Sequence, residues 1–336
     1  MTAGADRVAL VTGANGFIGS NVCRGLLEHG FRVIGTVRRE SNLSLLDSLD
    51  IELLTLDLRR RREIRLPAEL EFIVHAAAPV SDSAGDAECR AGIFDATRNL
   101  AEAALARSAK LRRFVYISTA LVLGYCREAI SPSRPGRSAA HIPYVRYKQQ
   151  TENLLLHLHR NRGLPVVVLR PADVYGEFDR TSIIPMCRSL ERGIPLLVGR
   201  GCARLAYCHI GTLVRAVIRA CTADDAIGRC YTVANLTTPS WREFFGLLGA
   251  GLGRAPRRPV PAGLAFGLTV VSELLHRIVP LARPPLTRYR FRRATADTTY
   301  AVAADARSLG FSPDEDIADQ LLTAARWFRR HCTQQQ

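Results

Sequence analysis

The sequence predicts an α/β fold, a doubly wound parallel sheet followed by a smaller C-terminal lobe. Short apolar segments alternate with helical patterns through the first half of the 336 residues, and this alternation is typical of a parallel sheet with helices on both faces. After Pro171 the alternation loosens, and proline and glycine become frequent. We therefore predict a sheet domain over residues 1–175, with later segments around 205–235 returning to it, and a second lobe made mainly of residues 176–336.

Six apolar segments bounded by turns are the predicted strands, because they are short and end at glycine, proline or polar residues. They cover Arg7–Gly13, Arg32–Val37, Ile51–Leu58, Phe72–Ala77, Arg113–Thr119 and Pro165–Pro171. Helical patterns fall between them at Gly19–His29, Thr97–Ser108 and Tyr144–His159, and later at Trp241–Leu252 and Leu321–Phe328.

Composition excludes several classes of protein. The formal charge is +15, but the one dense basic run is Arg59–Arg65, and charge alone gives only non-specific attraction to nucleic acid. The nine cysteines are an odd number without a C-x-x-C pair, so neither a disulfide framework nor a zinc site is expected. The first residues lack the charged-then-apolar order of a signal peptide. We expect a cytoplasmic protein with no metal and no specific nucleic acid.

The longest apolar stretch in the second half is Val260–Ser272. It is too short to span a bilayer. We expect a helix packed in the core or over a pocket, and contact with a membrane interface is the alternative.

A glycine-rich turn follows the first predicted strand. Gly13, Gly16 and Gly19 are spaced so that one permits a tight turn, one lets a pyrophosphate approach the backbone, and one lets helix and strand pack closely. The helix that begins there offers free N–H groups to the phosphates. The pattern predicts a Rossmann-type dinucleotide site, whose turn also contains Asn15, Phe17 and Ile18.

The ends of the next two strands bear on the choice of dinucleotide. Arg38 and Arg39 stand where an NAD-binding protein commonly places an acid. Guanidinium groups suit a 2′-phosphate, so NADP(H) is preferred over NAD(H). Asp57 and Leu58 end the third predicted strand, where Asp57 could meet the adenine or cap the following turn.

Tyr144 and Lys148 are the central catalytic candidates. Arginine supplies almost all basic residues here, and the only lysines are Lys110 and Lys148. A helix places residues four apart on one face, so the Lys148 ammonium is expected to lower the pKa of Tyr144 toward neutrality. Ser118 and Thr119 end the fifth predicted strand, at the edge where ligands of such sheets bind. We prefer Thr119 as the hydroxyl that holds a substrate oxygen.

Together, "TGANGFIG", "VHAAA", "YISTALVLG", Tyr144-x-x-x-Lys148 and "LRPADVYG" resemble the extended short-chain dehydrogenase/reductases over nearly the whole chain. Later segments resemble the branch of 3-beta-hydroxysteroid dehydrogenases and dihydroflavonol reductases. The resemblance implies a catalytic set of Thr119, Tyr144 and Lys148, and is compatible with a homodimer. It also implies cofactor contacts from Lys148, Ala76, Ala77, Ala78, Pro171, Ala172 and Val174. The chain departs from the family at Ile93, where an asparagine is usual.

Three functional hypotheses follow. The first is an NADPH-dependent oxidoreductase that interconverts a ketone or aldehyde and an alcohol on an apolar small molecule, with residues 260–285 as a substrate cover. The second is a nucleotide-sugar epimerase or dehydratase, in which Arg204 binds the substrate diphosphate. The third is a cofactor-binding protein without catalysis, for which Ile93 is the only support.

Overall fold

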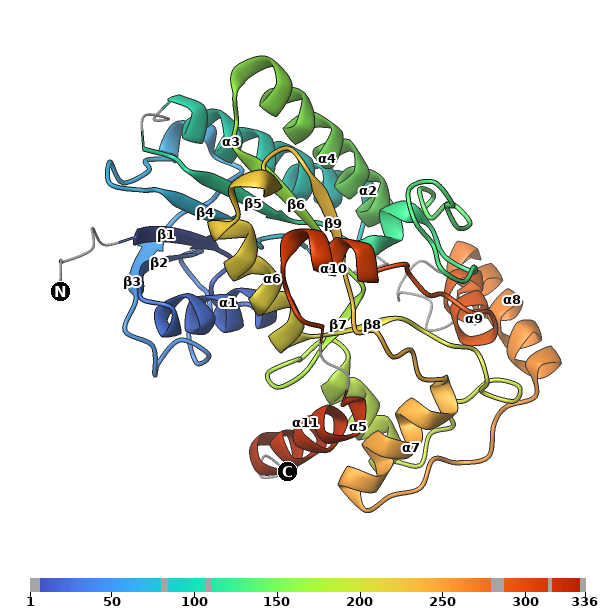
Figure 1. Ribbon diagram of the computed structural model, residues 1–336. Coiled ribbons are helices and arrows are strands. Elements are labelled where there is room, and N and C mark those ends of the chain that lie inside the picture. Colours follow the sequence, from blue (N-terminus) through green and yellow to red (C-terminus); the bar gives the residue numbers. More distant parts are fainter. Residues whose placement is uncertain (1–6, 80–83, 107–109, 279–286, 314–315, 333–336) are drawn as a thin grey trace.

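A seven-stranded, all-parallel sheet forms the centre of the protein, as a computed structural model shows (Figure 1). The structure describes residues 7–79, 84–106, 110–278, 287–313 and 316–332. The strand order is β3-β2-β1-β4-β5-β6-β9. These strands are β1 (Arg7–Thr12), β2 (Phe31–Val37), β3 (Glu52–Thr55), β4 (Phe72–His75), β5 (Arg113–Ile117), β6 (Val166–Pro171) and β9 (Cys230–Val233).

Both faces of the sheet are buried, as the unbroken apolar character of its strands predicts. In β1, Ala9 and Val11 point into one hydrophobic layer, while Val8 and Leu10 point into the other. The first layer contains α1 (Phe17–Glu28), α6 (Ile210–Thr222) and α10 (Ala303–Leu309). The second contains α3 (Ala96–Ala106) and α4 (Pro143–Arg162). The predicted doubly wound Rossmann-type fold is therefore confirmed.

A second group of helices lies below the sheet in Figure 1 and forms its own core. It consists of α5 (Ile183–Glu191), α7 (Trp241–Leu252) and α11 (Ile317–Cys332), which pack around buried aromatic residues such as Phe244 and Phe328. A short two-stranded parallel pair, β7 (Asp173–Tyr175) and β8 (Tyr207–His209), joins this group to the main sheet. The domain boundary at 175 stays a prediction.

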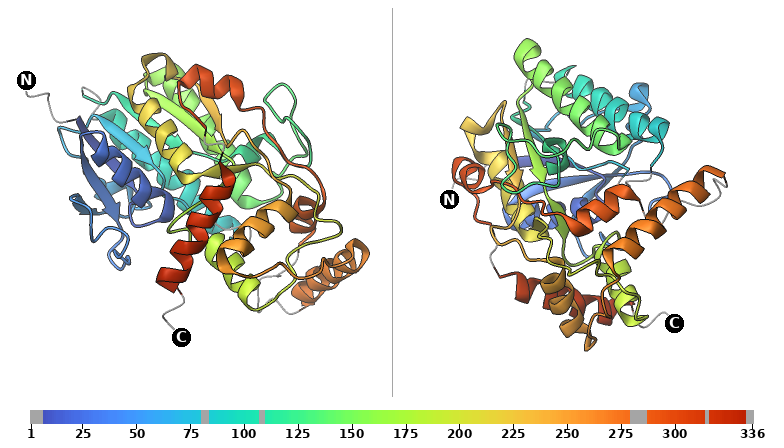
Figure 2. Two further views of the ribbon diagram at one scale, coloured as in Figure 1. Left: turned by 60° about the horizontal axis from the view of Figure 1, so that its bottom comes forward. Right: turned by 90° about the vertical axis from the view of Figure 1, so that its right-hand side faces the viewer.

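Two more helices, α8 (Ala262–Ile278) and α9 (Arg288–Thr295), pack together at the edge of the molecule (Figure 2). The expectation that the apolar stretch after Val260 is buried in the core is wrong for its large side chains. Leu264 and Leu268 are about half exposed, whereas the small residues Ala265 and Thr269 face inward. None of the helices in the described part of the chain is long and apolar enough to cross a bilayer.

The remaining elements are short. They are α2 (Asp86–Cys89), a π-helix η2 (Arg90–Asp95), and the 3₁₀ turns η1 (Arg61–Glu63), η3 (Ala120–Leu123) and η4 (Asp224–Ala226). The third strand is shorter than the predicted segment Ile51–Leu58. The seventh strand, β9, comes from the region around 205–235 and pairs with β6.

Candidate active site

The glycine turn between β1 and α1 is packed so closely that side chains do not fit. Gly13 has φ +67°, and a Cβ there would lie 2.9 Å from the Cα of Ala77 in the loop after β4. A Cβ on Gly19 would lie 2.1 Å from the carbonyl oxygen of Gly13. The loops after β1 and β4 therefore meet, and this is the point where the strand order reverses from one side of β1 to the other.

The N-terminus of α1 suits a phosphate group. Gly16 is its N-cap, no described side chain caps it, and its first turn contains no acidic residue. Unpaired N–H groups and the helix dipole favour an anion at such an end. Phe17 and Ile18 pack against the core while Asn15 is half-buried. The turn thus fits the pyrophosphate of a dinucleotide, in agreement with the sequence.

The other cofactor candidates lie along the same edge of the sheet. Ala76, Ala77 and Ala78 follow β4. Arg38 and Arg39 are exposed directly after β2, where the Arg38 backbone N–H donates to Ser41 Oγ at 3.0 Å.

Asp57 caps the turn that follows it, which is one of the two roles that its position in the sequence allows. Its carboxylate accepts from the Arg59 backbone and from the Arg59 guanidinium at 2.7–3.1 Å. Hydrogen bonding from Arg59, against the opposing effect of partial burial, lowers the pKa of Asp57 to about 2. Leu58 beside it is buried.

Tyr144 and Lys148 lie on the same side of α4, as their spacing predicts. The Lys148 Nζ is 5.9 Å from the centroid of the Tyr144 ring and 4.7 Å from that of Tyr116. It donates a hydrogen bond of 2.6 Å to the carbonyl oxygen of Ile117, the last residue of β5. Only 3% of Lys148 is exposed. The lysine is thus anchored at the carboxyl end of the strand that leads to Thr119.

The expected lowering of the Tyr144 pKa is wrong in this structure. Burial, together with the nearby Tyr289 and Asp173, raises the pKa of Tyr144 well above its ordinary value. Burial also lowers the pKa of Lys148 to about 7, although the charge of Glu152 opposes this shift. Because burial disfavours the Lys148 ammonium and its hydrogen bond goes to Ile117, it does little to stabilise a phenolate, and the Tyr144 phenol keeps its proton at neutral pH.

A buried ionic network lies one helical turn beyond Lys148. Glu152 is 3% exposed and accepts from Arg170 Nη2 at 2.6 Å and from Ser118 Oγ at 2.5 Å. Ser118 is held by this carboxylate and is not one of the described residues that line the pocket beside Thr119. Thr119, in contrast, lines the pocket, and its Oγ1 accepts from the Leu121 backbone at 3.3 Å. This difference favours Thr119 over Ser118 as a ligand-binding hydroxyl.

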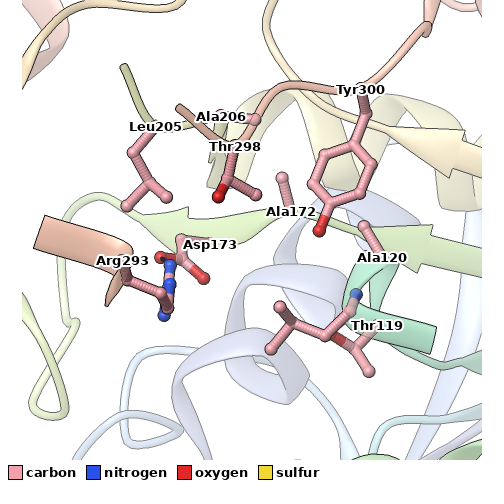
Figure 3. Close-up of a pocket in the computed structure, with 10 residues that line it drawn as sticks. Thr119, Ala120, Ala172, Asp173, Leu205, Ala206, Arg293, Thr298 and Tyr300 are labelled. Atoms are coloured by element: carbon pink, nitrogen blue, oxygen red, sulfur yellow. Dashed lines mark hydrogen bonds and ion pairs between the residues drawn. The ribbon is translucent and has the colours of Figure 1, made fainter. Parts of the chain in front are cut away.

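The pocket beside Thr119 has mixed walls (Figure 3). Ala172, which follows β6, lies in its wall, while Pro171 ends β6 and Val174 packs on the core. The pocket encloses about 210 Å³ of empty space, part of it open to solvent. Its lining residues are Thr119, Ala120, Leu121, Ala172, Asp173, Leu205, Ala206, Arg293, Thr298 and Tyr300.

Arg293 is a charged pocket residue that could not be predicted from the sequence. It lies on α9 and its guanidinium donates to the Asp173 carboxylate, as Figure 3 shows, and to the Tyr289 hydroxyl at 3.3 Å. Although burial opposes its charge, the Asp173 carboxylate raises the pKa of Arg293 above its ordinary value. The two residues are 120 positions apart in the chain, so only the tertiary fold brings them together.

Two further residues near Tyr144 have packing roles. Ile93, in the π-helix η2, is 1% exposed and belongs to the apolar cluster that contacts Tyr144 and Ala78. His75 ends β4 and bonds Thr12 Oγ1 at 2.6 Å and Thr97 Oγ1 at 2.8 Å. Burial, with a contribution from Lys148, lowers the pKa of His75 to about 3, so this imidazole is neutral and structural.

Sheet order and glycine turn together define a Rossmann-fold protein of the dinucleotide-binding class. Residues 9–234 match the model of the NAD dependent epimerase/dehydratase family, and the chain belongs to that family. This confirms the predicted membership of the extended short-chain dehydrogenase/reductases, and supports an NAD(P)-dependent oxidoreductase or epimerase.

Curated relatives span almost the entire chain. Sterol demethylase protein B of Methylococcus capsulatus is 28% identical, with 95% of this chain and 98% of the relative covered. A ketoreductase of Stigmatella aurantiaca, named for a 4-hydroxy-2-methyl-3-oxo-4-farnesyl-3,4-dihydroquinoline-1-oxide, is 27% identical over 90% of this chain and 91% of its own. Among solved structures, UDP-glucuronic acid 4-epimerase from Bacillus cereus in complex with NAD has a TM-score of 0.75 and 21% identity, covering 96% of this chain and 99% of the other.

Proposed function

We propose that this protein is an NADPH-dependent reductase that converts a ketone or aldehyde on an apolar small molecule into an alcohol. The observation that carries the proposal is the placement of Tyr144 and Lys148 on one side of α4, with Lys148 anchored to the carboxyl end of β5. Names of two relatives specify a sterol and a farnesylated dihydroquinoline, both apolar ring systems.

We also propose a cytoplasmic location, where its nine free thiols would stay reduced.

The proposed roles follow from the geometry. The glycine turn and the N-terminus of α1 would hold the pyrophosphate, and Lys148 would bond the ribose near the carboxyl end of β5. A bound nicotinamide cofactor would supply the hydride for the carbonyl carbon. Thr119 would donate a hydrogen bond to the carbonyl oxygen, and Tyr144 would deliver its proton to that oxygen.

The proton on Tyr144 is the one that a carbonyl reduction would use. A carbonyl reduction needs an acid, whereas alcohol oxidation needs a base. Because burial raises the pKa of Tyr144, the phenol is in the form that reduction requires.

The nucleotide-sugar alternative has less support, because Arg204 already bonds Glu128 at 2.5 Å and Asp297.

Removal of the Tyr144 hydroxyl tests the chemistry. In Tyr144→Phe, kcat for NADPH oxidation with cyclic ketones is expected to fall ~10²–10⁴-fold, while NADPH affinity measured by fluorescence stays unchanged. The matched control is Tyr147→Phe, which removes a hydroxyl bonded to Asp86 at 2.8 Å and should retain near wild-type turnover. Unchanged turnover in Tyr144→Phe would refute the acid role. Cofactor binding without turnover of any carbonyl by wild type would favour the silent alternative.

Replacement of Arg38 tests the cofactor. In Arg38→Ala, the KM for NADPH should rise ~10-fold because a charge-assisted contact to the 2′-phosphate is lost. The KM for NADH, which lacks that phosphate, serves as the internal control and should not change. Equal KM values for the two cofactors in wild type would exclude the NADP(H) preference.

A further inference from the structure

The helix α8 exposes most of the large apolar side chains found on the surface. Nine large hydrophobic residues are exposed in the described part of the chain, and six of them lie on this one helix. Their exposed fractions run from 46% to 57%. A contiguous apolar patch on a protein of this kind marks an interaction site. The six are Leu264, Phe266, Leu268, Val271, Leu274 and Leu275.

Helical spacing gathers four of these residues into one stripe. Leu264, Leu268, Val271 and Leu275 are separated by four, three and four positions, which places them on a single face of an α-helix. On the adjoining face, Ala265 and Thr269, each one position after a residue of the stripe, are buried at 7% and 1% exposure. The helix therefore turns its small residues inward and its leucines outward, the reverse of an ordinary surface helix.

Specific contacts hold α8 in this orientation. The ring of Phe266 packs on Phe291 of α9 with centroids 5.3 Å apart. On the buried side, Glu273 accepts from the Arg288 backbone at 2.8 Å and pairs with its guanidinium at 3.1 Å. Both contacts join α8 to α9, and no described residue covers the stripe, whose side chains are about half exposed.

The charge around α8 is strongly one-sided. Residues 253–295, which include α8, α9 and the segment leading into them, contain nine arginines and a single glutamate, Glu273. Eight of the fifteen net positive charges thus fall in this segment. Arg254, Arg257 and Arg258 are exposed just before α8, whereas Arg288 on α9 is exposed but paired with Glu273.

We propose that α8 is a membrane-docking helix that lies flat in the interface of an anionic bilayer. The leucine stripe would enter the boundary of the acyl chains while the flanking arginines meet lipid phosphates, the arrangement that interfacial amphipathic helices use. A second copy of this chain is disfavoured as the occupant, because it would bring an equally basic segment against the first. The proposal does not depend on the reductase assignment.

Vesicle binding by the full chain tests the docking surface. Wild type is expected to co-sediment with vesicles of phosphatidylglycerol and phosphatidylcholine at least ~10-fold more strongly than with phosphatidylcholine alone, and high salt should weaken this binding. The variant Leu264→Gln/Leu268→Gln/Leu275→Gln should lose that binding at least ~10-fold. A matched control, Leu53→Gln/Ile194→Gln/Leu236→Gln, changes three exposed apolar residues elsewhere and should bind as wild type does. Circular dichroism melting of both variants checks that each is folded.

Three results would overturn the proposal. The first is no binding of wild type to phosphatidylglycerol vesicles. The second is equal binding by wild type and the α8 variant, which would mean adsorption through net charge alone. The third is a dimer in sedimentation velocity that the α8 variant converts to monomer, without any vesicle binding by wild type, which would make the stripe an interface between copies.

Discussion

The helices α4 and α8 depart from the usual placement of side chains in opposite directions. α4 buries a lysine and a glutamate, Lys148 and Glu152, each at 3% exposure. α8 exposes leucines that an ordinary helix would bury. Each arrangement is costly by itself, since buried charges need partners and exposed apolar patches attract other surfaces.

The two helices differ in whether their unusual side chains have partners within the protein. Glu152 is satisfied within the chain by Arg170 and Ser118, and Lys148 by the Ile117 carbonyl. The leucine stripe of α8 has no such cover among the described residues. On α4, the buried charged residues are paired within the protein and lie beside the candidate active site. On α8, the exposed leucines have no partner among the described residues, as is expected of a surface that binds another molecule.

The largest expected effect comes from removing the cation that pairs with the buried Glu152 on α4. Arg170→Leu leaves Glu152 buried without its cation, so the free energy of unfolding should fall by ~3–5 kcal/mol. The matched control is Arg60→Leu, whose partner Glu63 is paired in the open, with side chains 67% and 56% exposed; its cost should be ~0–1 kcal/mol. Urea denaturation at pH 7 measures both. Similar losses in the two variants would show that the Glu152 network is not a buried ion pair in solution.

A packing comparison of the two helices should give nearly as large a contrast. Leu155 on α4 is fully buried, so Leu155→Ala should cost ~2–5 kcal/mol. The same substitution at Leu268 on α8 should change stability by no more than ~0.5 kcal/mol, because about half of that residue is already exposed to solvent. Thermal and urea unfolding of both variants are the measurements. A large loss at Leu268 would mean that the stripe is covered within the protein.

The smallest effect expected is a pH dependence that belongs to Lys148. Its pKa is lowered from 10.5 to about 7 in the fold, so between these values the unfolded chain binds more protons than the folded one. Stability from this group therefore rises with pH across that window, by at most ~1.4 kcal/mol per pH unit. In Lys148→Met this slope should be absent from unfolding measured between pH 7 and 9. Lys110→Met, at the exposed second lysine, should keep the wild-type slope, and a Lys148→Met slope equal to it would contradict the lowered pKa.

Local patterns were enough to predict most of the fold. The strands β1, β2, β4, β5 and β6 lie where the apolar segments predict them, because parallel strands buried on both faces are continuous apolar runs. The glycine spacing identified the turn before α1, because the need for glycine there is set by the backbone geometry of a few neighbouring residues. The edge strand β3 is shorter than predicted, and most of it is exposed.

Features that depend on tertiary contacts were harder to predict. The side of α4 shared by Tyr144 and Lys148 follows from helical spacing, but the direction of the Tyr144 pKa shift depends mainly on burial by the tertiary fold, with smaller contributions from Tyr289 and Asp173. The partnership of Arg293 with Asp173 has the same origin. For α8 the apolar composition predicted a helix, yet which of its faces is buried depends on its contacts with α9.

The position of β9 has a consequence for how the protein can assemble. This strand completes the sheet by pairing with β6, and the Ala172 N–H donates to the Val233 carbonyl at 2.9 Å. Until residue 233 has left the ribosome, β6 is an unprotected sheet edge that can recruit other chains. A fragment ending at the predicted boundary of 175 should therefore aggregate during synthesis, because the sheet is complete only when β9 has been made.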